Sequence, residues 1–106
     1  MPYLSICIPT CNQAKALDAL LESIEAGWDS RLEIVICDES DGDDSSLVVE
    51  KYSKIYPIKY LNRSRGGLDK AVLDLVQIAA GDYIWWIGDD KILPGGIRTI
   101  ISYLKE

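Results

Sequence analysis

Leu32-Glu33-Ile34-Val35-Ile36-Cys37 is a run in which Glu33 alone is polar. The run is short for a helix and rich in β-branched residues, which together indicate a strand. A strand with so little polar alternation is typical of a parallel sheet, because helices cover both faces of such a sheet. The run therefore predicts a parallel sheet, provided that helices and further strands flank it.

Helix and strand patterns do alternate on both sides of this run. Before it, apolar residues at spacings of three, four and seven predict a helix with the stripe Leu17, Leu20, Leu21 and Ile24. After it, a second helix that stops before Pro57 is predicted, with the apolar residues Leu47, Val48, Tyr52 and Ile55. Apolar runs at residues 3–9 and 58–61 predict two further strands.

The same alternation continues to the end of the chain. A third helix, ended by Gly81, is predicted from the stripe Leu68, Val72, Leu75, Val76 and Ala79. Residues 83–87 predict a fourth strand, and a last helix is expected over residues 94–104. Trp85 and Trp86 alternate in direction, so one is expected in the core on each side of the sheet.

The resulting order, βαβαβαβα, predicts an α/β fold. We expect a Rossmann-like parallel sheet with helices on both faces, as a single domain over residues 1–106.

Composition excludes several classes of protein. The chain has 106 residues, 48% of them hydrophobic and 26% charged, and its longest apolar runs are far too short to span a membrane. Its net charge of −6 is unfavourable for binding nucleic acid. Because the sequence contains no histidine, histidine acid/base catalysis, Ser-His-Asp triads and imidazole zinc sites are excluded.

Cysteine usage and the amino terminus bear on location. Cys7, Cys11 and Cys37 form no CxxC pair, and residues 1–3 lack the basic region of a signal peptide. We therefore expect reduced thiols and a cytoplasmic location, with a peripheral position at the inner membrane face as a further option. Cys7 and Cys37 lie in apolar runs and are expected to be buried.

Ligands of an open parallel sheet bind beyond the carboxyl ends of its strands. The sharpest feature there is Asp89-Asp90, shortly after the fourth predicted strand. Carboxylates are ligands that Mg²⁺ and Mn²⁺ prefer, and a cation held here could neutralise a diphosphate leaving group. The alternative is a solvated acidic turn between strand and helix.

Thr10, Asn12 and Asp38 follow the first two predicted strands. Asp38 could accept hydrogen bonds from a ribose or a base N–H, or it could serve as a turn or cap residue. Thr10 and Asn12 fit N-caps of the first helix, yet the backbone N–H groups there would still face a phosphate or a base. The residues leave both interpretations open.

Phosphate-binding motifs are absent from the sequence. It contains no GxxxxGK[ST] pattern and no GxGxxG after the first strand, which argues against a P-loop and a dinucleotide-binding Rossmann fold. Arg63 and Arg65 could pair with phosphate oxygens or could be solvated loop charges.

Four segments resemble family 2 glycosyltransferases with a GT-A fold. Residues 4–12, LSICIPTCN, are similar to a first strand that runs into Pro-Thr-Tyr-Asn, and residues 33–40, EIVICDES, to a second strand that ends in paired acidic residues. Residues 80–90, AGDYIWWIGDD, resemble the strand that leads into a DxD-type metal motif, and residues 94–96, PGG, the start of the next helix. The order matches the nucleotide-sugar-binding half of that fold.

The resemblance implies a nucleotide-diphosphate sugar as ligand. Pro9, Thr10 and Asn12 would line the nucleotide pocket, Asp38 would contact the base, and Glu39 would belong to the same site.

The resemblance also implies a metal site. Asp89 and Asp90 would hold Mg²⁺ or Mn²⁺ on the diphosphate, with Asp69 near the donor sugar. Gly88 stands where many members have the first Asp of the motif, and Cys11 replaces the usual aromatic residue.

Family catalytic domains are about twice this size or more, so the chain is expected to be a truncation or a short relative. No residue here matches the general base that an inverting transfer requires, and the catalytic residues stay unassigned. Exposed apolar surface or an unpaired sheet edge would favour self-association.

The sequence leads to two alternative functions. The first is the donor-binding domain of a glycosyltransferase that moves a sugar from a nucleotide-diphosphate sugar to an acceptor hydroxyl, in bacterial surface polysaccharide synthesis. The alternative is a non-catalytic α/β half-domain that acts as a binding or self-association module. A receiver-type domain is rejected, because the required acidic residues are replaced by Thr10, Cys11, Asn12 and Asn62.

Overall fold

A computed structural model of the chain describes residues 4–25, 28, 30–62 and 68–87. Strands and helices alternate there as the sequence predicts. In chain order they are β1 (Leu4–Thr10), α1 (Ala14–Glu25), β2 (Leu32–Asp38), α2 (Asp44–Tyr52), β3 (Ile58–Asn62), α3 (Leu68–Ile78) and β4 (Tyr83–Trp86). The helix expected over residues 94–104 lies outside the described residues. Among the described helices, none combines the length and the apolar character needed to cross a membrane.

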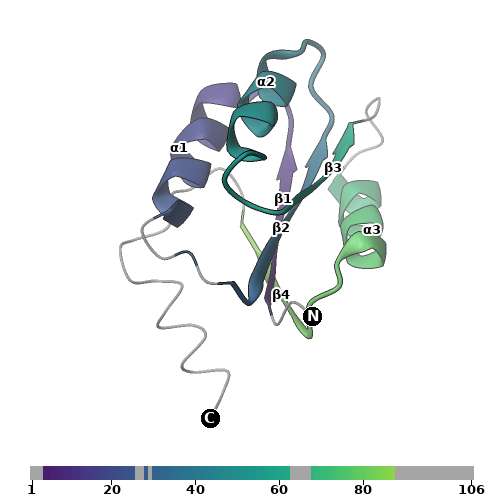
Figure 1. The fold of residues 1–106 in the computed structure, drawn as a ribbon. Coiled ribbons are helices and arrows are strands. Elements are labelled where there is room, and N and C mark those ends of the chain that lie inside the picture. The colour runs from purple at the N-terminus through teal and green to yellow at the C-terminus, as the bar shows by residue number, and fades with distance from the viewer. Residues whose placement is uncertain (1–3, 26–27, 29, 63–67, 88–106) are drawn as a thin grey trace.

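The described strands form one parallel sheet in the order β3-β2-β1-β4. The chain passes from β1 to β2 and β3, then returns to add β4 on the other side of β1. Because such crossovers are right-handed, this reversal sends α3 to the face opposite α1 and α2, as Figure 1 shows. The predicted sheet with helices on both faces is confirmed. Its reversal point, between β1 and β4, is where open α/β sheets bind ligands.

Successive residues of the central strands build two separate cores. On one face, Ile6 and Ile34 cluster with the predicted α1 stripe of Leu17, Leu20, Leu21 and Ile24. On the other face, Cys7, Val35 and Cys37 cluster with Ala71 and Leu75 of α3. Both cysteines are buried as predicted, and burial, followed by the nearby Glu33 carboxylate, raises the pKa of the Cys7 thiol to about 11.

The buried face of α2 differs in part from the prediction. Val49 and Tyr52 are buried, whereas Leu47 is 58% exposed and Ile55, beyond the helix, is 54% exposed. The cause is the packing of α2 on α1, where the Tyr52 hydroxyl donates a hydrogen bond to Asp18 Oδ1 at 2.7 Å. The predicted burial of Tyr52 is therefore confirmed, and its hydroxyl can be buried because it has a hydrogen-bond partner.

Trp86 also departs from the prediction. Trp85 contacts the core under α1 and α2, but Trp86 is 40% exposed. In the described part of the chain, α3 lies mainly on β1 and β2, so the outer strand β4 has little helical cover on that face.

A buried polar network joins the turn between α3 and β4 to the start of the sheet. The carboxylate of Glu33 accepts hydrogen bonds from Ser5 Oγ and from the Ala80 N–H, both at 2.6 Å, and pairs with Lys59 Nζ at 3.1 Å. Ser5 Oγ in turn accepts a hydrogen bond from the Gly81 N–H at 2.8 Å. The network holds the start of β4 beside β1.

Candidate functional site

The candidate site begins where β1 and β2 end side by side. Thr10 and Asp38 form the last register pair of these strands, and the Glu39 N–H donates to the Thr10 carbonyl at 2.9 Å just beyond it. Pro9, one residue earlier, is half-buried and pairs with Cys37. The structure therefore brings together Pro9, Thr10, Asn12, Asp38 and Glu39, the residues that the resemblance assigned to a nucleotide pocket.

Thr10 carries an unused hydroxyl. Its side chain is 5% exposed, and Oγ1 has no hydrogen-bond partner within the described part of the chain. The suggested N-cap role is wrong for Thr10, because its hydroxyl makes no such bond. A buried polar atom without a partner is uncommon in folded proteins, and a bound ligand is one way to satisfy it.

Asp38 is fully buried and its two carboxylate oxygens have separate partners. Oδ1 accepts the Ser40 N–H at 2.9 Å, which confirms the turn role considered for this residue. Oδ2 accepts the Tyr60 hydroxyl at 2.5 Å, and that hydroxyl accepts a hydrogen bond from Asn62 Nδ2 at 3.0 Å. Burial, followed by the Asp38 hydrogen bond, raises the pKa of Tyr60 to about 12, so Tyr60 remains a donor at neutral pH.

Asn12 links the loop after β1 to the loop after β2. Its backbone lies in the left-handed region with φ of 54°, and its side chain exchanges hydrogen bonds with Asp41. The suggested N-cap role is therefore wrong for Asn12 as well. The residue before α1 is Gln13, whose carbonyl accepts the Leu17 N–H at 2.9 Å.

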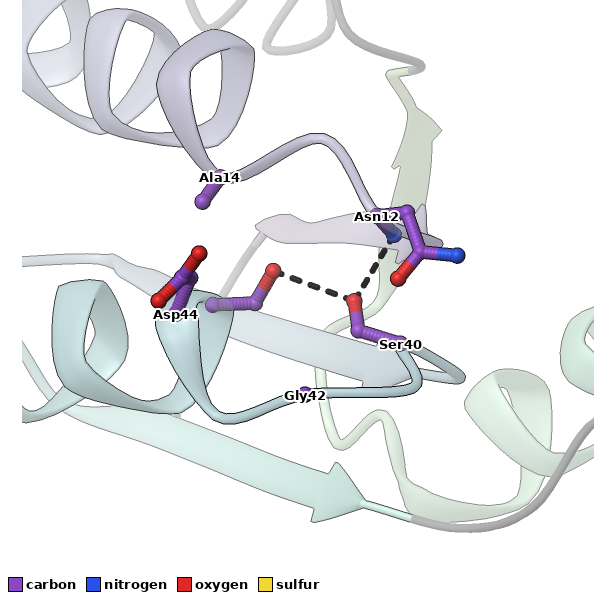
Figure 2. Close-up of a pocket in the computed structure, with 6 residues that line it drawn as sticks. Asn12, Ala14, Ser40, Gly42 and Asp44 are labelled. Carbon is purple, nitrogen blue, oxygen red and sulfur yellow. Dashed lines mark hydrogen bonds between the residues drawn. The ribbon is translucent and has the colours of Figure 1, made fainter.

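A pocket of about 140 Å³ lies between the starts of α1 and α2. Figure 2 shows its lining, which comprises Asn12, Ala14, Ser40, Gly42, Asp44 and Ser45. The volume is below the roughly 300 Å³ of typical ligand pockets, so this hollow by itself is too small for a nucleotide. The sequence reasoning did not assign Ser40 or Ser45 to a site. Both are ordinary turn and helix-start residues, and no local pattern distinguishes them.

Other predicted site residues are described only in part. Asp69 is the second residue of α3, but its side chain lies outside the described structure. Asp89 and Asp90, and likewise Arg63 and Arg65, lie outside the described residues. Within the described ranges, no three His, Cys, Asp or Glu side chains form a group that could hold a metal ion. The assignment of the cation to Asp89 and Asp90 therefore stays a prediction.

Comparison with known proteins identifies the family. Residues 5–106 match the family described as glycosyl transferase family 2. The chain is 34% identical over 109 residues to abequosyltransferase RfbV of Salmonella typhimurium, covering 97% of this chain and 33% of RfbV. It is 30% identical over 110 residues to GalNAc(5)-diNAcBac-PP-undecaprenol beta-1,3-glucosyltransferase of Campylobacter jejuni, covering 100% of this chain and 36% of that enzyme.

Solved structures share the fold. S. aureus TarS, residues 1–349, superposes with a TM-score of 0.87 and 25% identity, covering 97% of this chain and 32% of TarS. Mannosyltransferase PcManGT from Pyrobaculum calidifontis, solved with GDP-Man and Mn²⁺, superposes with a TM-score of 0.83 and 20% identity, covering 98% of this chain and 32% of PcManGT. The chain thus spans about a third of the length of the proteins it matches.

Proposed function

The chain belongs to glycosyl transferase family 2, and we propose that it is the donor-binding part of an enzyme that uses a nucleotide-diphosphate sugar. Sugar transfer to an acceptor hydroxyl is proposed for a protein of the relatives' length, because the chain spans a third of those relatives. The general base and the acceptor site stay unassigned. The interpretation of residues 1–106 as a single domain also stays a prediction.

The arrangement of Thr10 and Asp38 carries this proposal. They end neighbouring strands, of which β1 borders the reversal point of the sheet, and Thr10 Oγ1 is a buried hydroxyl that lacks a described partner. We assign the base contact to Asp38 and the pocket lining to Pro9 and Thr10. Glu39 continues the same edge. Each oxygen of the Asp38 carboxylate has one partner from the protein and keeps a second lone pair for a ligand donor.

Charge supports the need for a cation. Five carboxylates lie within residues 38–44, at Asp38, Glu39, Asp41, Asp43 and Asp44. A diphosphate beside this loop would be repelled unless positive charge intervened. We propose that Asp89 and Asp90 hold Mg²⁺ or Mn²⁺, whose oxygen-ligand preference fits two carboxylates and a diphosphate. The cation would neutralise the leaving diphosphate. Asp69 is proposed to lie near the donor sugar.

We test the proposal by calorimetric titration of UDP and of GDP into the folded chain, first with Mn²⁺ and then with EDTA. Binding of either nucleotide that EDTA abolishes is the expected result. Asp90→Ala should abolish the metal-dependent binding. Asp82→Ala is the matched control, because Asp82 precedes β4 and so lies at the opposite end of the strands.

Each other outcome has a distinct meaning. Nucleotide binding that survives both EDTA and Asp90→Ala would show that the cation assignment is wrong. A folded chain that binds neither UDP nor GDP would contradict the donor-binding proposal and favour the binding or self-association module.

Self-association stays a prediction with its own support. Large apolar side chains are exposed on the second and third helices and on the outer strand, including Leu47, Leu73, Val76 and Trp86. Light scattering on a size-exclusion column measures it directly, and a monomer that binds nucleotide would contradict the alternative function.

The biological setting is proposed from the name of one relative. The C. jejuni relative is named for a PP-undecaprenol-linked sugar chain, which supports a role in bacterial surface polysaccharide synthesis. Comparison of cytosolic and membrane fractions of cells that produce the protein would test the predicted cytoplasmic location.

A further inference from the structure

The loops after β1 and β2 are joined by hydrogen bonds beyond the end of the sheet. The Asn12 N–H donates to Ser40 Oγ at 2.8 Å, Asn12 Nδ2 donates to Asp41 Oδ2 at 3.1 Å, and the Asp41 N–H donates to Asn12 Oδ1 at 2.9 Å. These partners are 28 or 29 residues apart in the sequence. We call this set, Asn12 with Ser40 and Asp41, the loop strap.

The strap continues into α2. Ser40 Oγ lies 3.1 Å from the hydroxyl of Ser45, which is 1% exposed in the first turn of that helix. Figure 2 shows the path from the Asn12 backbone through Ser40 toward α2, beside the first residues of α1. A continuous set of hydrogen bonds thus connects the loop before α1 to the first turn of α2, and both helices cover the same face of the sheet.

Asn12 suits this position for two separate reasons. Its φ of 54° is in the left-handed region, which asparagine and aspartate tolerate better than other residues with a side chain. Its amide also supplies both a donor and an acceptor to Asp41. A substitution must keep the backbone conformation if it is to test the hydrogen bonds alone.

The Asn12 and Asp41 ends of the strap are exposed and Ser40 is half-buried, although the residues that the strap flanks are buried. Asn12 and Asp41 are exposed, whereas Thr10 and Asp38, at the adjoining strand ends, are 5% and 0% exposed. Exposed hydrogen bonds contribute little to the global free energy of unfolding. They can still restrict two loops that would otherwise have to be ordered when a ligand binds.

We propose that Asn12 and Asp41 are positioning residues, which hold the two loops in the arrangement that binds the donor nucleotide. This inference rests on the proposed function. It replaces the direct nucleotide contact predicted for Asn12, because both polar atoms of that side chain already face Asp41. It also gives a positioning role to Asp41.

The test is a side-chain swap, read out as the dissociation constant of UDP or GDP in the presence of Mn²⁺. Asn12→Asp keeps the left-handed backbone but sets two carboxylates against each other. Weakening of nucleotide binding by about tenfold is expected, the upper range for losing such a hydrogen-bonded pair. The double variant Asn12→Asp with Asp41→Asn again pairs one amide side chain with one carboxylate side chain. It should return the dissociation constant to within about threefold of wild type.

Added charge could weaken binding without any role for the strap, so a charge control is needed. Gly42→Asp adds one carboxylate to the same loop, and a Cβ at Gly42 meets nothing within 4 Å. This variant measures the effect of charge alone, and the Asn12→Asp effect is expected to exceed it.

A second readout separates positioning from a structural role. Nucleotide binding and urea unfolding are measured on wild type, Asn12→Asp, Asp41→Asn and the double variant, which together give the coupling between positions 12 and 41. That coupling should be smaller in urea unfolding than in nucleotide binding. Equal coupling in both measurements would overturn the inference. It would also be overturned if Asn12→Asp bound the nucleotide within twofold of wild type, or if the double variant bound it no better than Asn12→Asp does. A folded wild-type chain that binds neither nucleotide overturns the proposed function first, and this inference with it.

Discussion

The hydroxyl of Tyr60, in the middle of β3, donates a hydrogen bond to Asp38 Oδ2 at the end of β2. Asp38 is fully buried, so its carboxylate depends on protein donors, of which Tyr60 and the Ser40 N–H are two. Asn62 Nδ2 donates to the same Tyr60 hydroxyl and directs its proton toward Asp38. The third strand, which carries no predicted ligand contact, thus orients the residue proposed to contact the base.

Tyr60→Phe should weaken both folding and nucleotide binding. The change leaves a buried carboxylate with one donor fewer, which costs about 1–3 kcal/mol in the free energy of unfolding. Urea unfolding measures this cost. Tyr83→Phe is the control, since Tyr83 is 43% exposed and its change should stay within about 0.5 kcal/mol. Equal stability of the two variants would contradict the role assigned to Tyr60.

Gly81→Ala should destabilise the junction of β4 with the sheet. A Cβ at position 81 would lie 2.6 Å from Ser5 Oγ, 2.7 Å from Ser5 N and 3.0 Å from the Leu4 carbonyl carbon. Two of these are backbone atoms of β1 that cannot move independently, so we expect a loss of about 1–3 kcal/mol.

Gly42→Ala is the matched control for that prediction. Its Cβ would meet nothing within 4 Å. Because alanine restricts the unfolded chain more than glycine does, the free energy of unfolding should stay unchanged or rise by up to about 1 kcal/mol. Thermal unfolding of both variants makes the comparison. A neutral Gly81→Ala would show that β1 and β4 tolerate a wider separation than the distances indicate.

Glu33 should make the protein sensitive to acid. Burial acts to raise the pKa of this carboxyl, but hydrogen bonds from Ser5, the Ala80 N–H and Lys59 outweigh it and leave the pKa below its usual value. A pKa depressed in the folded state contributes stability above the unfolded-state pKa of about 4.3. That contribution is lost as pH falls through the lower folded-state pKa.

The measurement for Glu33 is the free energy of unfolding as a function of pH, with Glu33→Gln beside wild type. The variant should be less stable at pH 7 by about 1–3 kcal/mol and should lose less stability between pH 5 and pH 3. Lys59→Met should cost less than about 1 kcal/mol, because Lys59 is 45% exposed. Parallel pH profiles for wild type and Glu33→Gln would contradict this account.

Local sequence pattern was sufficient for the alternating fold and for one helix face. Because parallel strands are buried on both sides, the nearly unbroken apolar run of β2 directly predicts a strand inside a parallel sheet. The α1 stripe of Leu17, Leu20, Leu21 and Ile24 is buried as its spacing predicts. The place of the site at the strand ends follows from the same reasoning, because every parallel strand in such a sheet ends at one edge.

The pairings across the fold depended on tertiary structure. The order β3-β2-β1-β4 decides that α3 covers the other face, and no local period encodes it. The packing of α1 on α2 buries Val49 and Tyr52 and leaves Leu47 exposed to solvent. Asn12 meets Asp41, and Glu33 meets Ala80, only because register brings residues 29 and 47 positions apart into contact. Periodicity reports which way a side chain points along its own helix or strand, whereas its partner is set by the strand order and register of the whole sheet.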